Sequence, residues 1–214
     1  MDDLTPLPDA ATPATRDPDL TRGRILDAAF ELFVEKGFAG VAMREIAERS
    51  GVTKSLIHHH FGSKEALWDA TKEQAFSQYA ESQRTELKQN PRSDEALLRN
   101  SVIDYFNFLK NNPRVVRLFA WTHLEGDASC GEMDAELVAL GAERIRQAQQ
   151  AGIFRRDINP VHVVTTFVMA CTHWFEARSH HAQWPGIGND DEFLDDFLKL
   201  FMAGLAPSAD ASPA

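Results

Sequence analysis

The 214-residue sequence has little cysteine and no long hydrophobic segment. Its two cysteines, Cys130 and Cys171, form no CxxC pair, which argues against a disulfide scaffold and against a cysteine-built zinc site. No run of about 18 apolar residues occurs, and the acidic, proline-rich N-terminus lacks the features of a secretory signal. We therefore expect a cytoplasmic protein that has no membrane partner.

Motifs of catalysis and of cofactor binding are also missing. The sequence contains no glycine-rich phosphate loop, GxSxG elbow or HExxH pair, so we expect neither an enzyme nor a cofactor. The consecutive histidines 58–60 point about 100° apart on a helix and cannot converge on one metal ion. His173, Glu176 and His180 share one helical face, and there we favour a polar stripe over a metal site.

Positive charge is concentrated in one short segment. The whole chain carries 22 basic and 32 acidic residues, for a net charge of −10. Residues 21–64 have seven basic and five acidic residues and are the only net-positive part, since residues 1–20 and 65–214 carry −4 and −8. Phosphates attract basic surfaces and are repelled by acidic ones. Any nucleic-acid partner is therefore expected to bind residues 21–64.

The hydrophobic pattern predicts an all-α fold, because apolar residues recur at helical spacing and no segment alternates like a strand. A first helix should begin at Thr21 and end at Gly37, followed by a short helix over 42–49. After the turn at Ser50-Gly51, a third helix capped by Thr53 should run to about residue 59. Two short helices joined by a tight glycine turn are typical of a helix-turn-helix.

Caps and breakers place the remaining helices. Ser63 is a plausible N-cap for a long fourth helix that ends before Pro91, and Asn159-Pro160 marks another helix start. The punctuation predicts further helices over 94–110, 114–124, 132–151, 160–181 and 191–203. Residues 1–20 and 207–214 lack an apolar pattern and are expected to be disordered tails.

Two of the predicted helices, 160–181 and 191–203, are apolar over about half of their circumference. A helix that faces one core needs a narrower stripe, so both should have neighbours on two sides. The simplest arrangement is a two-fold dimer in which these helices form a four-helix bundle. The apolar residues assigned to this homodimer interface are Val164, Val168, Cys171, Phe175, Phe197, Leu198 and Phe201.

The net-positive segment resembles the DNA-binding domain of TetR-type transcriptional regulators. The resemblance covers residues 21–68 and rests on RILDAAFELFVEKGF followed by AMREIAERSGVTKSLIHHHFGSKEALW, with AGIFRRDINP at 151–160 as a further match. It implies a helix-turn-helix DNA-binding domain over 21–66 and a helical effector-binding and dimerisation domain over 67–206. The expected partner is a pseudo-palindromic double-stranded DNA operator.

Carried onto this sequence, the resemblance assigns the recognition helix and its phosphate contacts. Lys54 and Ser55 lie at its groove-facing start, and Lys64 matches the family's phosphate-binding lysine. Leu56, His58 and Ala42 depart from the common residues, and Leu56 either contacts a thymine methyl or packs internally. The residues that we expect to contact DNA are Thr21, Arg22, Arg44, Thr53, Lys54, Ser55, Leu56, His58, His59 and Lys64.

The resemblance also implies a small-molecule effector bound in the C-terminal domain. The sequence does not identify it, and we expect the lining to include Phe106, Trp121, His123, Met169 and His173. The favoured interpretation is a repressor that leaves its operator when the effector binds. Two alternatives stay open, a metal-responsive regulator and a helical interaction protein that does not read DNA.

Overall fold

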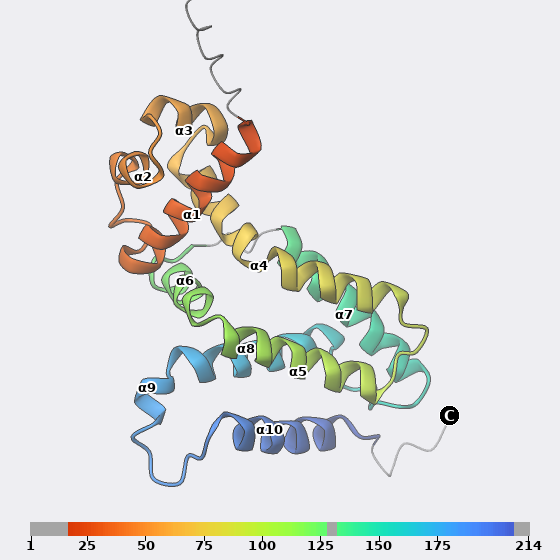
Figure 1. Cartoon of the computed structure of the whole chain (residues 1–214). Helices are drawn as coiled ribbons and strands as arrows, with labels where there is room; N and C mark the ends of the chain where they lie inside the picture. Colours follow the sequence, from red (N-terminus) through yellow and green to blue (C-terminus); the bar gives the residue numbers. More distant parts are fainter. Residues whose placement is uncertain (1–16, 128–131, 208–214) are drawn as a thin grey trace, which may run out of the picture.

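The computed structural model describes residues 17–127 and 132–207, and every regular element in these ranges is a helix. Helices α1 to α3 form a compact head, and the remaining helices form a larger body (Figure 1). Helix α4 (Lys64–Gln89) belongs to both, because it starts beside the head and continues along the body. The all-α prediction is therefore confirmed. Within the described ranges, no helix is both long and apolar enough to cross a bilayer.

Helix α1 (Pro18–Lys36) begins three residues earlier than predicted. The Asp17 carboxylate caps it by accepting a hydrogen bond from the Asp19 N–H at 2.9 Å, and proline takes the first helical position. Thr21 is consequently inside the helix rather than at its cap. The segment expected to be a tail thus contributes its last residues to the head.

The helix-turn-helix matches the prediction closely. Helix α2 (Met43–Ser50) ends at Gly51, whose φ of 67° is the left-handed conformation that glycine adopts without strain. The Thr53 hydroxyl then caps α3 (Lys54–Phe61) by accepting from the Leu56 N–H at 3.2 Å. Two differences are small: α2 is shifted by one residue from the predicted 42–49, and α3 extends two residues beyond the predicted 59.

The head has a dense core of its own. Ile25 and Phe33 from α1, Ile46 from α2 and Ile57 from α3 are each 0% exposed. Their burial fixes the angle between α2 and α3, because Ile57 is the single fully buried side chain of α3. The same cluster includes Leu67, Trp68 and Leu118, so the core of the head reaches beyond the expected boundary at residue 66.

The body contains α5 (Glu95–Asn111), α6 (Pro113–Leu124), α7 (Glu132–Gln150), α8 (Pro160–Glu176), α9 (Arg178–His181) and α10 (Asp190–Leu205). The single helix expected over 160–181 is two helices, because the chain turns at Ala177. The Asp190 carboxylate holds this turn. It is 5% exposed, accepts from Trp174 Nε1 at 3.1 Å and pairs with Arg178 at 2.8 Å.

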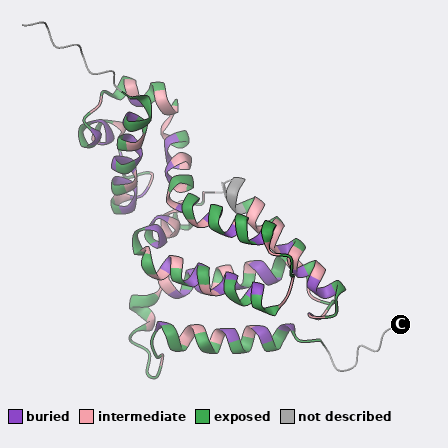
Figure 2. Ribbon diagram, turned by 45° about the vertical axis from the view of Figure 1, so that its right-hand side comes forward, coloured by how far each residue is buried: buried purple, intermediate pink, exposed green. Residues whose placement is uncertain are grey.

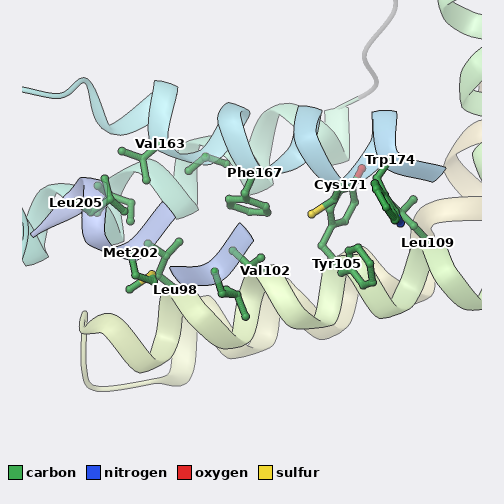
Figure 3. Close-up of a cluster of buried hydrophobic side chains, with 14 of the residues drawn as sticks. Leu98, Val102, Tyr105, Leu109, Val163, Phe167, Cys171, Trp174, Met202 and Leu205 are labelled. Carbon is green, nitrogen blue, oxygen red and sulfur yellow. The ribbon is translucent and has the colours of Figure 1, made fainter. Parts of the chain in front are cut away.

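The body core lies between α5, α8 and α10 (Figure 3). Val164, Cys171 and Leu198 were expected at a dimer interface, yet all three are buried within one chain at 6%, 0% and 5% exposure. The wide apolar arc of α8 therefore serves the interior of the subunit. Burial also raises the pKa of the Cys171 thiol to about 12, so that the thiol stays protonated.

The outer surfaces of the last helices differ from this core. Figure 2 shows α10 at the edge of the body with exposed residues along much of its length. Among the exposed residues are two large hydrophobic side chains, Met169 on α8 and Leu200 on α10, at 70% and 76% exposure. Phe197 and Phe201 are half-buried and stack on each other. Val168 and Phe175 are half-buried too.

Candidate nucleic-acid interface and ligand cavity

Helix α3 presents a polar surface while Ile57 anchors it. The side chains of Lys54, Ser55, His58 and His59 are exposed, as is the cap residue Thr53. Exposed donors at the start of a helix are suited to phosphate oxygens and base edges. Leu56 is half-buried, so both interpretations of this residue remain predictions.

Two carboxylates of the head, Glu45 and Glu31, are paired with cations away from α3. Lys36 Nζ lies 2.5 Å from Glu45, and Arg49 lies 2.9 Å from Glu31. The Lys36 hydrogen bond lowers the pKa of Glu45, which stays ionised. In the described part of the chain, the cations Arg22, Lys54 and Lys64 have no carboxylate partner. The net positive charge of the head is thus available at α3 and at the adjoining helix ends.

Aromatic rings hold two of these cations in place. The Arg22 guanidinium lies 5.1 Å from the centre of the Phe61 ring, and Lys64 Nζ lies 4.3 Å from that of Phe38. Such contacts orient a cation and leave its charge unneutralised. His58 is oriented as well, because its Nδ1 lies 2.8 Å from the Gly62 carbonyl and must donate to it.

Two of the residues expected to contact DNA are placed differently from the rest. Thr21 is only 4% exposed, and this corrects its assignment, because a buried hydroxyl does not reach a phosphate. Arg44 is exposed and forms an ion pair with Glu48 at 3.3 Å. A pair this exposed is weak, so a phosphate can replace the glutamate.

The body encloses a cavity of about 570 Å³ between α4, α5, α6, α7 and α8. Its walls follow α4 from Asp69 to Leu87, a span of roughly 27 Å at 1.5 Å per residue. The middle is aromatic and aliphatic. Six rings line the cavity, those of Phe76, Tyr79, Tyr105, Phe119, Phe154 and Phe167. A cavity of this volume and lining is typical of sites for small organic molecules.

A few buried polar groups interrupt the apolar wall. The hydroxyls of Tyr105 and Thr172 lie 2.8 Å apart, and Gln83 donates to Asp104 at 3.1 Å. Burial raises the pKa of Tyr79 well above its ordinary value, so the phenol stays neutral. The middle of the cavity therefore carries hydrogen-bonding groups and no net charge.

Charged side chains gather at the two ends of the cavity. Asp69, Lys72, Glu73 and Asp127 line the end nearest the head. Lys72 Nζ lies 3.0 Å from Asp69 and 2.5 Å from Asp127. At the far end, the Arg144 guanidinium donates to Gln147 Oε1 and to the Asn90 carbonyl.

The structure places only part of the expected lining on the cavity wall. His123 and Met169 are there, whereas Phe106, Trp121 and His173 are not. Phe106 is fully buried and packs on Phe175, with ring centres 4.8 Å apart. Trp121 faces the head, and His173 is exposed on the outside of α8. These three residues therefore lie off the cavity wall, because helical periodicity does not reveal which neighbour a face meets.

The residues that sequence reasoning missed lie mainly on α4. Asp69, Lys72, Phe76, Tyr79, Gln83 and Leu87 recur every three or four positions and form one face. The mixture of charged, aromatic and amide side chains along a single face was the available signal. A core-facing stripe without a cavity would be more uniformly apolar.

The acidic end of the cavity is connected directly to the core of the head. Asp127 accepts from Trp68 Nε1 at 2.7 Å as well as from Lys72. The Trp68 ring in turn packs edge-on against Phe33, with centres 4.9 Å apart. A continuous chain of contacts thus links Asp127 at the cavity to Phe33, a fully buried residue of α1.

A second contact joins the loop after α1 to the end of α6. The Glu125 carboxylate accepts from the Ala39 N–H at 3.1 and 3.2 Å, and Trp121 Nε1 donates to the Val34 carbonyl at 3.2 Å. Between them lies Gly37, with φ of 73°. A Cβ atom there would come within 2.5 Å of Glu125 Oε1 and 2.7 Å of the Trp121 ring, so only glycine fits.

The histidines of α8 and α9 do not converge on a metal ion. No cluster of three or more potential metal ligands occurs in residues 17–127 and 132–207. Glu176 lies 3.3 Å from His123 Nδ1, while His180 follows the turn at Ala177 on α9. His173 instead packs near His181, with ring centres 5.6 Å apart. Cys130 lies outside the described residues.

Comparison with known proteins gives consistent matches along the chain. Residues 25–71 match the family described as bacterial regulatory proteins, tetR family, and residues 98–192 match the tetracyclin repressor-like C-terminal domain. The HTH-type transcriptional repressor NicS of Pseudomonas putida is 24% identical over 168 residues, which cover 76% of this chain and 78% of NicS.

Solved structures show the same fold. The transcriptional regulator FadR from Bacillus subtilis, in complex with stearoyl-CoA, superposes with a TM-score of 0.65 at 17% identity, covering 86% of this chain and 98% of FadR. AibR in complex with isovaleryl coenzyme A and operator DNA gives a TM-score of 0.61 at 20% identity, covering 84% of this chain and 97% of AibR. At these identities the likeness concerns the fold alone.

Proposed function

This chain belongs to the TetR family of bacterial regulatory proteins, and from that premise we propose that it is a homodimeric, ligand-responsive repressor of transcription. The observation that carries the proposal is the division of the chain between a head with unneutralised cations around an exposed α3 and a body with a cavity lined mainly by apolar side chains. Such a protein works beside the chromosome, in the cytoplasm.

DNA recognition is assigned to α3 and its neighbouring helix ends. In this role Lys54 and Ser55 contact base edges in the major groove, while Arg22, Thr53 and Lys64 contact phosphates. His58 and His59 complete the exposed surface of the helix. Because α3 is only eight residues long, a single head offers too few contacts for a specific site.

Two heads in one dimer supply the remaining contacts. The outer face of α10 carries exposed Leu200 beside the half-buried Phe197 and Phe201, and this patch is suited to a second copy. A two-fold dimer places its recognition helices about one turn of DNA apart, on a pseudo-palindromic operator. AibR provides a precedent for operator binding with this fold.

The cavity is assigned to the effector because its acidic end adjoins the head. A ligand that alters the positions of Lys72 and Asp127 also alters Trp68, and through it the placement of α1. Linkage requires that the effector bind more tightly to one spacing of the two heads than to the other. The description of NicS as a transcriptional repressor supports repression, and we assign to the effector the release of this chain from its operator.

The experiment that tests DNA reading is a selection of bound fragments from random duplex DNA at two salt concentrations. We expect enrichment of an inverted repeat and an affinity that falls steeply with salt, because phosphate binding releases counterions. A flat salt response without enrichment would instead favour the alternative of a helical interaction protein.

Two lysine variants then separate the roles within the head. Lys64→Ala should weaken binding to every sequence alike and reduce the slope of log affinity against log salt by about one unit per head. Lys54→Ala should also relax base preference in a repeated selection. Fluorescence anisotropy with the selected operator and with scrambled DNA measures both effects. Equal loss of sequence preference in the two variants would contradict the assignment.

A further inference from the structure

We propose that the cavity of the body binds an elongated, largely apolar organic cation, with its positive group at the end formed by Asp69, Glu73 and Asp127. The inference rests on the proposed function only in taking this cavity as the effector site. It concerns the charge and shape of the ligand, which neither the fold nor the family determines.

The shape of the cavity requires a long ligand. A volume of about 570 Å³ spread along α4 from Asp69 to Leu87 fits a chain or a row of fused rings better than a compact molecule. The wall offers apolar side chains for most of this length. Its buried polar groups, such as the Tyr105 and Thr172 hydroxyls, are bonded to each other. Most of the ligand must therefore be apolar.

The charge at the end nearest the head is negative. Asp69, Glu73 and Asp127 are three carboxylates, and Lys72 is the lysine among the lining residues there. The Lys72 ammonium lies between Asp69 and Asp127, which leaves it engaged by two carboxylates. Glu73 has no hydrogen-bond or ion-pair partner in the described part of the chain. The end retains a net negative charge that a ligand cation can neutralise.

A carboxylate just behind this end adds to the negative charge. Glu176 is largely buried, and its Oε1 atom is 3.3 Å from His123 Nδ1 but receives no hydrogen bond in the described structure. His123 lines the cavity, so the negative charge of Glu176 lies directly behind the cavity wall.

Aromatic rings next to the acidic end strengthen the preference for a cation. Phe76 and Phe119 line the cavity directly beyond Glu73 and Thr122, with their ring centres 6.0 Å apart. The face of an aromatic ring attracts a positive charge and repels a negative one. Carboxylates and rings together give a cation both a counter-charge and a low-energy apolar surface.

At the opposite end, Arg144 has no carboxylate partner among the described residues, but neutral protein oxygens already accept from its guanidinium. The Arg144 guanidinium donates to Gln147 and to the Asn90 carbonyl, and its Nε atom is buried without a partner and out of reach of solvent. Ser93 also donates to Gln147 at 2.7 Å. This cluster ties α7 to the loop before α5, and Asp94 on the same wall adds a further carboxylate.

The same charges disfavour an acyl-coenzyme A, the class of ligand named for FadR and AibR. Coenzyme A carries several phosphate charges, and unneutralised cations would be needed to bind them. The side chains that line the head-proximal end instead include three carboxylates and one occupied lysine. We therefore expect this chain to differ from those two proteins in its ligand.

A matched series of three ligands tests the inference directly. Decyltrimethylammonium, decan-1-ol and decanoate share one chain length and differ in head-group charge. Isothermal titration of the full-length protein without DNA should rank them cation, alcohol, anion, with the cation at least about tenfold tighter than decanoate. Stearoyl-CoA is the fourth ligand and should bind more weakly than the cation.

Two glutamine variants on α4 locate the positive group. Glu73→Gln should weaken decyltrimethylammonium about threefold to tenfold and leave decan-1-ol unchanged. Glu81→Gln is the control, because Glu81 lies on the same helix outside the cavity and pairs with Arg84. Both glutamates are exposed, and thermal unfolding checks that each variant folds.

The outcomes separate this inference from the proposed function. Tighter binding of decanoate or stearoyl-CoA, equal binding of all three decyl compounds, no binding of any, or the same loss in Glu73→Gln and Glu81→Gln would each overturn the inference. Operator release is measured separately by anisotropy. Cation-selective binding without any change in operator affinity would support the inference and contradict the proposal of a ligand-responsive repressor.

Discussion

The head and the body of this protein are both built from helices, but their hydrophobic cores are packed differently. In the head, Ile25, Phe33, Ile46 and Ile57 are completely buried, and the residues around them close the space between three helices. In the body, the core between α5, α8 and α10 borders a cavity of about 570 Å³, and many of its side chains are only half-buried.

The difference shows where each part of the molecule needs rigidity. A reading head must hold α3 at a fixed angle, so its interior is packed without space for a ligand. The body leaves side chains such as Phe76 with neighbours on one side and the cavity on the other. A ligand can complete that packing, and the energy of doing so is available for changing the conformation.

The largest expected effect on stability comes from removing one phenylalanine side chain from each core. Phe33→Ala should lower the free energy of unfolding by about 4 kcal/mol, because a fully buried ring leaves a new void. Phe76→Ala should cost about 2 kcal/mol, since this ring already borders a cavity that the truncation only enlarges. Urea denaturation followed by circular dichroism measures both, and equal losses would contradict the comparison.

A smaller effect concerns the link between the two cores. Asp127→Asn removes the charge that joins Lys72 to Trp68, so the ligand-induced change in operator affinity should fall about fivefold. Operator affinity without ligand should change little. The measurement is anisotropy without ligand and with saturating decyltrimethylammonium, because Asp127 also lines the ligand site. Asp191→Asn is the control, because Asp191 pairs with Lys110 far from the head. A similar loss in this control would show that Asp127 has no particular role in linking the cavity to the head.

The smallest expected effect compares surface ion pairs of the two parts under acid. Arg155 donates two hydrogen bonds to Asp157 in the loop before α8 and lowers the pKa of that carboxyl from 3.8 to about 2. The pair therefore contributes stability above pH 3.8 and loses it as the pH falls through 2.

Asp157→Asn should thus lower the melting temperature slightly at pH 7, and the difference from the unmodified protein should shrink between pH 4 and 2. Glu45→Gln is the counterpart in the head, because the Lys36 hydrogen bond lowers the pKa of Glu45. Thermal melts across this pH range compare the two variants. A difference that grows toward low pH would reverse the assigned sign.

The head could be predicted almost to the residue because its signals are local. Thr53 and Ser63 cap the helices that they were expected to cap, and Gly51 turns the chain where predicted. The error at the start of α1 was avoidable. Asp17-Pro18 carries the same cap-and-proline signal that correctly predicted the start of α8 at Asn159-Pro160.

The body could be predicted only as a set of helices. Its cavity depends on which faces meet, and periodicity does not distinguish a wall from a filled core. Trp121 illustrates the problem, because it lies on a cavity-forming helix yet points to the head. No glycine or proline marks the turn at Ala177 in the sequence. The turn is instead held by the tertiary contacts of Asp190 with Trp174 and Arg178.

The close contact at Gly37 restricts which bodies can be joined to this head in a hybrid protein. Its lack of a side chain makes room for Trp121 and Glu125 of the body, so the two parts fit as a matched pair. A hybrid that joins this head to another regulator's body inherits the fit only if the recipient has an equivalent tryptophan and glutamate. Construction of new sensors from this chain should therefore move α6 together with the head.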